Sequence, residues 1–246
     1  MEPIFRQEYE ITAFHLDCFG RAKPSVLLHL AQEAAGAHCL ELAADWDTLA
    51  ARHMFWAVTR QKLQITRLPQ LGERITMETW PMPTTKVAYP RSTVAYDEKG
   101  NEVFRAISLW VLMNTDTRAM ILPGKSGLEI RGALRGNELA LPASLHPQLL
   151  EHSCRRRVAY GDLDRNRHMN NARYMDWVDD LLPSEFHKEH PAHEVTVCYH
   201  AEATEGQELT LNYRVSPEGE LRVDGLRDKA DAPGEQERIF SARVCF

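Results

Sequence analysis

The first half of the chain shows short runs of alternating apolar and polar residues, interrupted by one long helical pattern. The alternation over residues 4–13 predicts a strand. Pro24 then occupies the favourable first position of a helical run that continues to Trp46. Four further strands are expected, at residues 55–68, 74–80, 86–96 and 102–114. This half therefore predicts a strand, a long buried helix and an antiparallel meander.

The second half repeats this order after a stretch of different composition. Residues 122–147 are richer in Gly and Pro and show no sustained period, so we expect them to form a linker. A strand at 152–160 and a short amphipathic helix at 171–182, ended by Pro183, come next. Four more strands are then expected, at residues 194–201, 208–216, 220–228 and 238–246.

A local sequence match supports a duplication. The segments GERITM at 72–77 and GQELTL at 206–211 each open a predicted strand, at an offset of 134 residues (206 minus 72). We therefore predict the α+β class and a tandem (double) hotdog, in which each repeat is an antiparallel β-sheet wrapped around a central helix. The expected division is an N-terminal hotdog at 1–121, a linker at 122–147 and a C-terminal hotdog at 148–246.

Composition narrows the class of protein. The chain has 246 residues, and no apolar run reaches the roughly 18 residues that suggest a membrane span. Its net charge of −6 argues against nucleic acid as a partner. The five cysteines are widely spaced, without a C-x-x-C pair, which fits reduced thiols. The N-terminus shows no secretory or transit pattern, so a cytoplasmic location is expected.

The most unusual stretch is the polar run DLDRNRHMNN before the second predicted helix. Side chains at i, i+2 and i+4 of an extended backbone share one face, so Asp164, Asn166 and His168 would converge there as an acid/base group. An alternative is purely structural, because Asp and Asn are common in turns and Asn170 or Asn171 would serve as a helix N-cap. The residues alone leave both interpretations open.

The segment DLDRNRHMNNARYMDW resembles the D-x-N-x-H-x-N-N-x-x-Y signature of acyl-acyl carrier protein thioesterases, the family of the plant plastid enzymes and their bacterial relatives. SLWVLMNTDTRAMILP is similar to the Trp-containing strand and Asp-x-x-x-Arg turn of that family. With the two-hotdog layout, the resemblance covers nearly the whole chain. It implies hydrolysis of acyl-acyl carrier protein thioesters to free fatty acid and holo-acyl carrier protein, without a metal or organic cofactor.

By the same resemblance, Asp164, Asn166 and His168 are the expected catalytic residues. The segment YHAEA at 199–203 is similar to the one that bears the family's acidic catalytic residue, which would be Glu202. Plant members have a Cys directly after that Glu, where this chain has Ala203, so a cysteine nucleophile at that position is excluded.

Hydrolysis of a thioester needs a base for the water proton, a group that orients the water, and donors for the oxyanion. We expect Glu202 or Asp164 to be the base, and the choice between them stays open. Asn166 would orient water or carbonyl, and His168 would polarise the site and relay protons. The first free N–H groups of the helix beginning near Asn171 are the expected oxyanion donors.

The first half lacks this chemistry. Its equivalent run, DCFGRAK at 17–23, contains neither Asn nor His, so one active site per chain is expected. The resemblance implies that the N-terminal hotdog binds the acyl chain and the C-terminal one is catalytic. Trp56 is a candidate wall of the acyl pocket, although an aromatic residue at that position also suits an ordinary core.

Positive charge gathers around the expected site. The expected partner is an acyl carrier protein bearing an acyl-phosphopantetheine, and an acidic carrier would be steered by this charge, with Arg165 and Arg167 as substrate-binding residues. The alternative is an ordinary solvated strand and loop. The arginines concerned are Arg155, Arg156, Arg157, Arg165, Arg167 and Arg173.

Other signals carry less. His187, His190 and His193 have a spacing that zinc sites use, but Pro191 makes a regular helix there doubtful, so no metal site is predicted. Cys198 is expected to be a small buried side chain rather than a nucleophile. Rival functions are an acyl-CoA thioesterase of hotdog type and a non-catalytic acyl-binding protein, and a hydroxyacyl dehydratase is disfavoured. A homodimer stays open.

Overall fold

The computed structural model describes residues 4–136, 138–229, 232 and 234–246. The chain divides into two compact units, Met1–Pro142 and Ala143–Phe246. The boundary falls inside the stretch 122–147 that the sequence marks as a linker. Residues 1–3 of the expected N-terminal domain, and residue 137 of the expected linker, lie outside the described residues.

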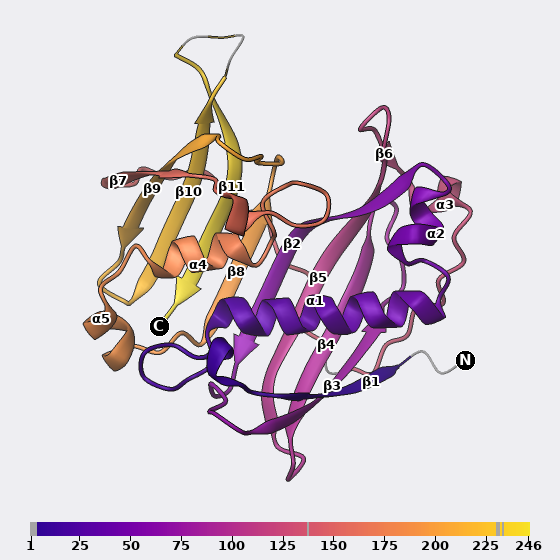
Figure 1. Cartoon of the computed structure of the whole chain (residues 1–246), viewed down its shortest axis with the longest axis horizontal. Coiled ribbons are helices and arrows are strands. Elements are labelled where there is room, and N and C mark those ends of the chain that lie inside the picture. The colour runs from indigo at the N-terminus through magenta and orange to yellow at the C-terminus, as the bar shows by residue number, and fades with distance from the viewer. Residues whose placement is uncertain (1–3, 137, 230–231, 233) are drawn as a thin grey trace. The chain divides into compact units, whose positions relative to one another are not determined.

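The first unit is an antiparallel sheet with the strand order β1-β3-β4-β5-β2, and β6 pairs with β5. Helix α1 crosses one face of this sheet (Figure 1). The strands are β1 (Phe5–Glu10), β2 (Met54–Ile65), β3 (Arg74–Pro81), β4 (Tyr89–Asp97), β5 (Glu102–Asn114) and β6 (Met120–Ile121). The helices are η1 (Ala13–His15), α1 (Pro24–Glu41), α2 (Trp46–Ala50) and α3 (Pro123–Ser126).

Helix α1 begins at Pro24 as expected and buries a face rich in small residues, including Ala31, Ala34 and Ala35. Small side chains let the helix approach the sheet closely. The single helix predicted as far as Trp46 is wrong, because α1 ends at Glu41 and a separate α2 follows. The Asp45 carboxylate caps α2 by accepting two of its first backbone N–H groups, which starts a new helix there.

The start of β4 is also later than predicted. The sequence pattern placed it at residue 86, whereas the strand begins at Tyr89. The Thr85 hydroxyl accepts the backbone N–H groups of Val87 and Ala88, at 3.3 and 2.9 Å, and so closes a turn before the strand.

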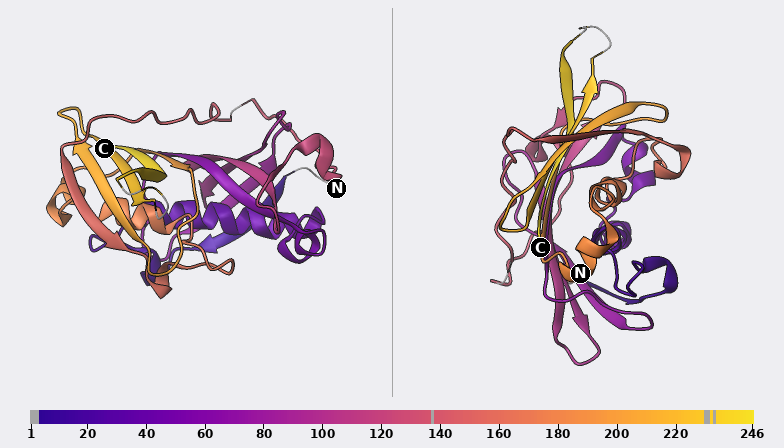
Figure 2. Two further views of the ribbon diagram at one scale, coloured as in Figure 1. Left: turned by 90° about the horizontal axis from the view of Figure 1, so that it is seen from above. Right: turned by 90° about the vertical axis from the view of Figure 1, so that its left-hand side faces the viewer.

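Part of the predicted linker is attached to the first unit. The backbone N–H of Ala133 donates to the Pro81 carbonyl at 2.9 Å, and the Arg135 guanidinium lies 5.1 Å from the centre of the Trp80 ring. Arg135 also pairs with Glu78 on β3. Figure 2 shows this segment on the side of the sheet away from α1. Residues 133–135 therefore lie against the outer face of the first sheet.

The second unit repeats the main strand order of the first, β1-β3-β4-β5-β2, as β7-β9-β10-β11-β8. Helix α4 lies over one face of its sheet (Figure 1). The fold is thus an α+β double hotdog. The strands are β7 (His152–Arg157), β8 (Glu194–Tyr199), β9 (Glu208–Val215), β10 (Glu220–Asp228) and β11 (Gln236–Cys245). The helices are η2 (Tyr160–Asp162), α4 (Arg173–Asp179) and α5 (Ser184–Glu189).

Matching hydrogen bonds confirm that the two units are copies of one design. In the first unit the backbone N–H of Ala22 donates to the Pro69 carbonyl at 2.8 Å, and in the second unit Met169 donates to Ala203 at 2.8 Å. The acceptors are 134 residues apart (203 minus 69), the same offset as in the sequence match. The donors are 147 residues apart (169 minus 22). The loop before the first long helix is therefore the structural counterpart of the loop that carries His168.

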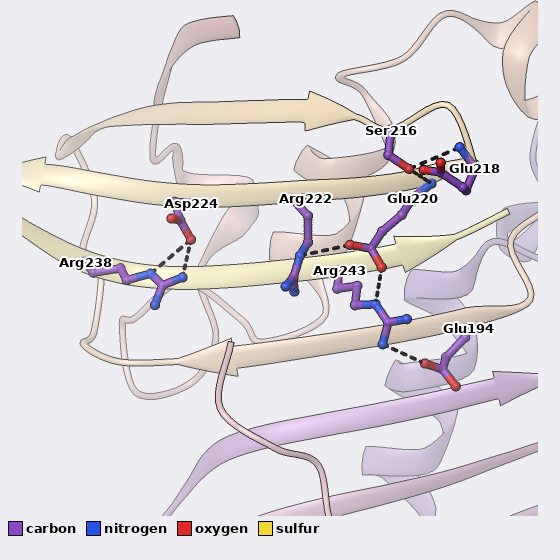
Figure 3. A network of polar contacts seen from close by, with 8 residues as sticks. All are labelled: Glu194, Ser216, Glu218, Glu220, Arg222, Asp224, Arg238 and Arg243. Atoms are coloured by element: carbon purple, nitrogen blue, oxygen red, sulfur yellow. Dashed lines mark hydrogen bonds and ion pairs between the residues drawn. The ribbon is translucent and has the colours of Figure 1, made fainter. Parts of the chain in front are cut away.

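The outer face of the second sheet carries a network of cross-strand ion pairs (Figure 3). Arg243 on β11 contacts Glu220 at 2.6 Å and Glu194 at 3.3 Å, and Arg238 pairs with Asp224. Pairs of opposite charge on neighbouring strands stabilise a sheet modestly. Because these arginines are satisfied within the second unit, where Arg238 also donates to the Leu145 carbonyl at 2.6 Å, we assign this network a structural role.

No helix in the described part of the chain combines the length and apolar character that a membrane crossing requires.

Candidate active site

The polar run 164–168 forms a tight turn, so the extended backbone expected from the sequence is wrong. One oxygen of the Asp164 carboxylate accepts the backbone N–H groups of Asn166 at 2.8 Å and of His168 at 3.3 Å. The backbone N–H of Asp164 donates to the His168 carbonyl at 2.8 Å, which closes the turn. The backbone thus reverses around the Asp164 carboxylate, a common use of Asp in turns, and the Asn166 side-chain nitrogen lies 3.5 Å from that carboxylate.

His168 and Glu202 meet across an isolated bridge between two segments of the second unit. His168 bridges to Thr204, and the next residue, Met169, donates its backbone N–H to Ala203 at 2.8 Å. The imidazole Nε2 of His168 lies 3.3 Å from the Glu202 carboxylate Oε2. The His168 side chain is 17% exposed and that of Glu202 is 44% exposed. Solvent therefore reaches the Glu202 carboxylate, while the less exposed His168 imidazole contacts it from the interior of the unit.

Arg227 on β10 fixes the segment that carries Glu202. One of its guanidinium nitrogens donates to the Glu202 backbone carbonyl at 3.1 Å and to the Gln207 side-chain oxygen at 2.6 Å. The same Gln207 oxygen accepts the backbone N–H of Thr204 at 3.0 Å. Nothing in the sequence pattern signals this role, because Arg227 lies 25 residues beyond Glu202 and reaches it only through the strand register.

Tyr174 on α4 closes the site from the helix side, a role that the amphipathic pattern of residues 171–182 does not indicate. Its hydroxyl hydrogen-bonds to the backbone of Ala203, and its ring packs against Tyr199 and Phe240, at centroid distances of 5.6 and 4.7 Å. Burial raises the pKa of the Tyr174 hydroxyl well above its ordinary value, so the group stays neutral. The final Tyr of the D-x-N-x-H-x-N-N-x-x-Y signature falls on Tyr174, and this match is the sequence signal that could have identified it.

The expected oxyanion donors at the start of the helix need correction. Helix α4 begins at Arg173 rather than near Asn171. The side-chain oxygen of Asn170 accepts the backbone N–H of Ala172 at 2.9 Å, and its carbonyl accepts that of Arg173 at 2.9 Å. These two N–H groups are therefore occupied. The Asn171 carbonyl accepts the hydroxyl of Tyr199 at 2.9 Å.

The arginine cluster is largely compensated inside the second unit. Arg157 donates to a backbone carbonyl, and three other arginines contact carboxylates of the chain itself. Those pairs are Arg155–Glu208 at 3.4 Å, Arg156–Asp180 at 2.9 Å and Arg173–Asp176 at 3.0 Å. Arg165 and Arg167 are exposed on the turn itself. Most of this cluster thus stabilises the fold, and the partner-binding role of Arg165 and Arg167 stays a prediction.

Trp56 in the first unit has the contacts of a core residue. Its indole N–H donates to the Ala44 carbonyl at 2.8 Å, and its ring meets Tyr89 edge to face at 4.9 Å. It packs against the buried cluster of Leu49, Met54, Tyr89 and Leu112. Its expected role as a pocket wall stays a prediction.

Cys198 and His187, which the sequence raised as a candidate nucleophile and a candidate metal ligand, have ordinary structural surroundings. Cys198 is 1% exposed, in strand β8. The His187 ring lies 2.8 Å from the Asp179 carbonyl oxygen. Over the ranges that the structure describes, no group of three or more His, Cys, Asp or Glu side chains is placed to hold a metal ion.

Curated relatives of the chain are plant enzymes. It is 26% identical over 217 residues to the chloroplastic palmitoyl-acyl carrier protein thioesterase of Gossypium hirsutum, covering 81% of this chain and 52% of that one. It is 24% identical over 220 residues to the chloroplastic oleoyl-acyl carrier protein thioesterase of Coriandrum sativum, covering 80% and 59%. The chain thus spans between half and two thirds of the length of these relatives.

Solved structures and family models match the chain over almost its whole length. An acyl-ACP thioesterase from Bacteroides thetaiotaomicron superposes with a TM-score of 0.87 at 23% identity, covering 99% of this chain and 98% of that one. The 12:0-ACP thioesterase from Umbellularia californica gives 0.80 at 23% identity, covering 100% and 97%. These likenesses show the fold. The model of the acyl-ACP thioesterase N-terminal domain matches residues 2–122 and that of the C-terminal domain matches residues 148–239, so the chain belongs to the acyl-ACP thioesterase family.

Proposed function

We propose that this protein hydrolyses thioesters of acyl carrier protein, releasing a free fatty acid and holo-acyl carrier protein. The observation that carries the proposal is the contact between the His168 imidazole and the half-exposed Glu202 carboxylate in the second unit. A carboxylate and an imidazole in hydrogen-bond range form an acid/base pair suited to activating water. The names of the relatives supply the substrate class, an acyl chain carried on acyl carrier protein.

In the proposed reaction the Glu202 carboxylate removes a proton from a water molecule as that water attacks the thioester carbonyl carbon. His168 holds the carboxylate through Nε2, 3.3 Å away, and keeps it oriented. When the tetrahedral intermediate collapses, the carbon–sulfur bond breaks and the proton passes from the pair to the thiolate sulfur. Water and thioester thus give one carboxylic acid and one thiol, with no covalent enzyme intermediate.

Asp164 and Asn166 have supporting roles in this proposal. The Asp164 carboxylate already accepts two backbone N–H groups of its own turn, so we assign it to organising the turn rather than to removing the proton. Asn166 is exposed on the same turn, and its carboxamide is the donor that we assign to the thioester carbonyl oxygen. This assignment replaces the helix N–H groups that Asn170 occupies.

The test is thiol release from acyl-acyl carrier protein and from acyl-CoA over several chain lengths. The protein should turn over the carrier-protein thioester with the higher kcat/KM. Glu202→Gln should lower that value by about 10²–10³-fold, the size of effect expected for a general base, while far-UV circular dichroism stays unchanged. Absence of turnover on every thioester would overturn the proposal and favour a non-catalytic acyl-binding protein.

We propose the cytoplasm as the location and leave the homodimer as a hypothesis. Fractionation of the source cells and the concentration dependence of sedimentation would test the two statements separately.

A further inference from the structure

A groove of about 780 Å³ lies within the first unit, whereas the proposed catalytic residues belong to the second. One wall is the turn before β4, and the other is the stretch that contains α3. Its apolar lining comes from one aromatic and several aliphatic side chains. These are Tyr89, Leu122, Leu128 and Ile130.

Hydrogen bonds to the buried Ser126 hold the α3 wall in place. The Tyr89 hydroxyl donates to the Ser126 hydroxyl oxygen at 2.8 Å, and the backbone N–H of Leu128 donates to the same oxygen at 3.0 Å. Arg52 donates to the Ser126 carbonyl at 2.7 Å. The opposite wall is the turn closed by the Thr85 hydroxyl. Both walls are thus fixed by bonds within the unit, so the groove exists before any partner binds.

The groove carries positive charge that the chain does not neutralise. Lys86, Lys125 and Arg131 line it and are exposed, and Glu129 is the one acidic residue among its lining. Within the described residues, these three cations have no carboxylate at ion-pair distance. Such a concentration is notable in a chain with a net charge of −6.

Another hollow of the first unit provides a contrast. It measures about 550 Å³ and contains two arginines and four acidic residues, and its Arg6 pairs with Glu78 at 2.7 Å. The arginine cluster of the second unit is compensated in a similar way. The groove beside Tyr89 differs because its cations face solvent above an apolar floor.

We propose that this groove is the docking surface for the acidic face of the acyl carrier protein. The proposal rests on the proposed function, which brings the substrate on that carrier. An acidic amphipathic helix fits the groove because its apolar residues would cover Leu128 and Ile130 while its carboxylates meet Lys86 and Lys125 at the rim. Buried apolar contacts supply affinity at such a surface, and the surrounding charges steer the encounter and set its orientation.

The experiment measures binding of unacylated holo-acyl carrier protein by fluorescence anisotropy, so that no turnover is needed. Lys86→Glu with Lys125→Glu should weaken the affinity about tenfold at low ionic strength, and the difference should shrink in 0.5 M salt. Lys99→Glu with Lys229→Glu changes the net charge equally at residues that do not line the groove, and should leave the affinity within about twofold. The docking role would be overturned if the groove variant and the control variant bound the carrier protein with the same affinity, whether or not that affinity is below the wild-type value.

Kinetics separate this proposal from the proposed function. With the groove variant, KM for the acyl-carrier-protein thioester should rise about tenfold, whereas kcat/KM for the neutral acyl-N-acetylcysteamine thioester should not change. A wild-type protein that hydrolyses neither substrate contradicts the proposed function, while the binding result still decides the docking role. A groove variant that loses both activities equally contradicts the docking role alone.

Discussion

The two units contain the same turn with different side chains, and only one version can do acid/base chemistry. In the first unit, Asp17 accepts the backbone N–H groups of Phe19 and Arg21, both at 2.9 Å. In the second unit, Asp164 accepts those of the matching residues, Asn166 and His168. The backbone scaffold is therefore independent of catalysis, and the Asp of each turn is first a structural residue.

The two turns differ in the side chains that surround the central Asp. Arg21 donates through two nitrogens, each at 3.0 Å, to the second oxygen of Asp17, so this ion pair closes the first turn on itself. By the 134-residue offset, the position of Glu202 corresponds to Leu68. One turn thus satisfies its charges internally, whereas the other directs an imidazole at a partly exposed carboxylate.

The largest expected effect comes from copying the first turn into the second. His168→Arg should reduce kcat/KM for an acyl-carrier-protein thioester by about 10³-fold, because acid/base groups contribute 10²–10⁴-fold. The protein should stay folded, since Asp17 already holds an arginine at the corresponding position. Thiol-release kinetics and circular dichroism measure the two outcomes.

The reverse change is the matched control. Arg21→His should leave kcat/KM within about twofold, because its ion pair is a partly exposed structural contact. A loss of activity comparable to that of His168→Arg would show that the first turn also contributes to catalysis.

The unequal helices give a pH-dependent difference between the units. Only the longer helix, α1, buries a histidine, His38, whose pKa falls from 6.5 to about 4 because of burial and the nearby Arg91 guanidinium. The unfolded chain therefore takes up this proton first as the pH falls below about 6.5. The His38 contribution to the unfolding free energy is present above that pH, and about 2 kcal/mol of it should be lost by pH 5.

Urea unfolding at pH 7.5 and at pH 5, followed by tryptophan fluorescence in a Trp177→Phe background so that the signal comes from the first unit, measures this loss. His38→Gln should remove the larger part of the pH dependence. An unchanged pH profile in that variant would mean that other groups cause it.

A smaller effect should follow from making β10 resemble β4. Gly225 on β10 lies opposite Phe240, as Ala95 on β4 lies opposite Phe104. A Cβ at Gly225 would stand 2.1 Å from the Phe240 ring, which itself packs on Tyr174. Gly225→Ala should therefore lower the unfolding free energy by about 2 kcal/mol, within the range for an overpacked core.

The control for that change is Gly36→Ala in the middle of α1, where a Cβ meets nothing within 4 Å. It should raise the unfolding free energy by about 0.5–1 kcal/mol, the usual gain of Ala over Gly in a helix. Equal effects of the two substitutions in thermal melts would contradict the close Phe240 contact.

The smallest effect concerns the positive φ inside each turn. The first unit uses Gly20 there, with φ of 79°, whereas the second uses Arg167, with φ of 63°. A non-glycine residue is strained in this region, so Arg167→Gly should raise the unfolding free energy by up to about 1 kcal/mol. Thermal melts should show this as a slightly higher melting temperature. A clear drop in stability would mean that the Arg167 side chain makes compensating contacts.

The strands could be predicted well because their signals are local. The bounds of β5 and β10 match the alternating runs at 102–114 and 220–228, each bordered by clear turn residues. The turn at Asp164 could not be read from periodicity, because side-chain hydrogen bonds to the backbone override an extended pattern. The same bonding by Asn170 shortened the predicted second helix.

The candidate site divides in the same way. The contact of His168 with Glu202 was anticipated from the resemblance, and the structure places the two groups 3.3 Å apart. Arg227 was missed because only the pairing of β9, β10 and β11 brings it to the Glu202 backbone. Positioning residues of this kind have no local motif, so they become visible only once the sheet register is known.

The central claim is that His168 and Glu202 act as one acid/base unit, and a double-mutant cycle on kcat/KM tests it most directly. His168→Ala and Glu202→Gln should each cost about 10²–10³-fold with an acyl-carrier-protein thioester, and the double variant should fall within a few-fold of the worse single variant. Losses that multiply, so that the double variant shows the product of the two single effects, would contradict the account.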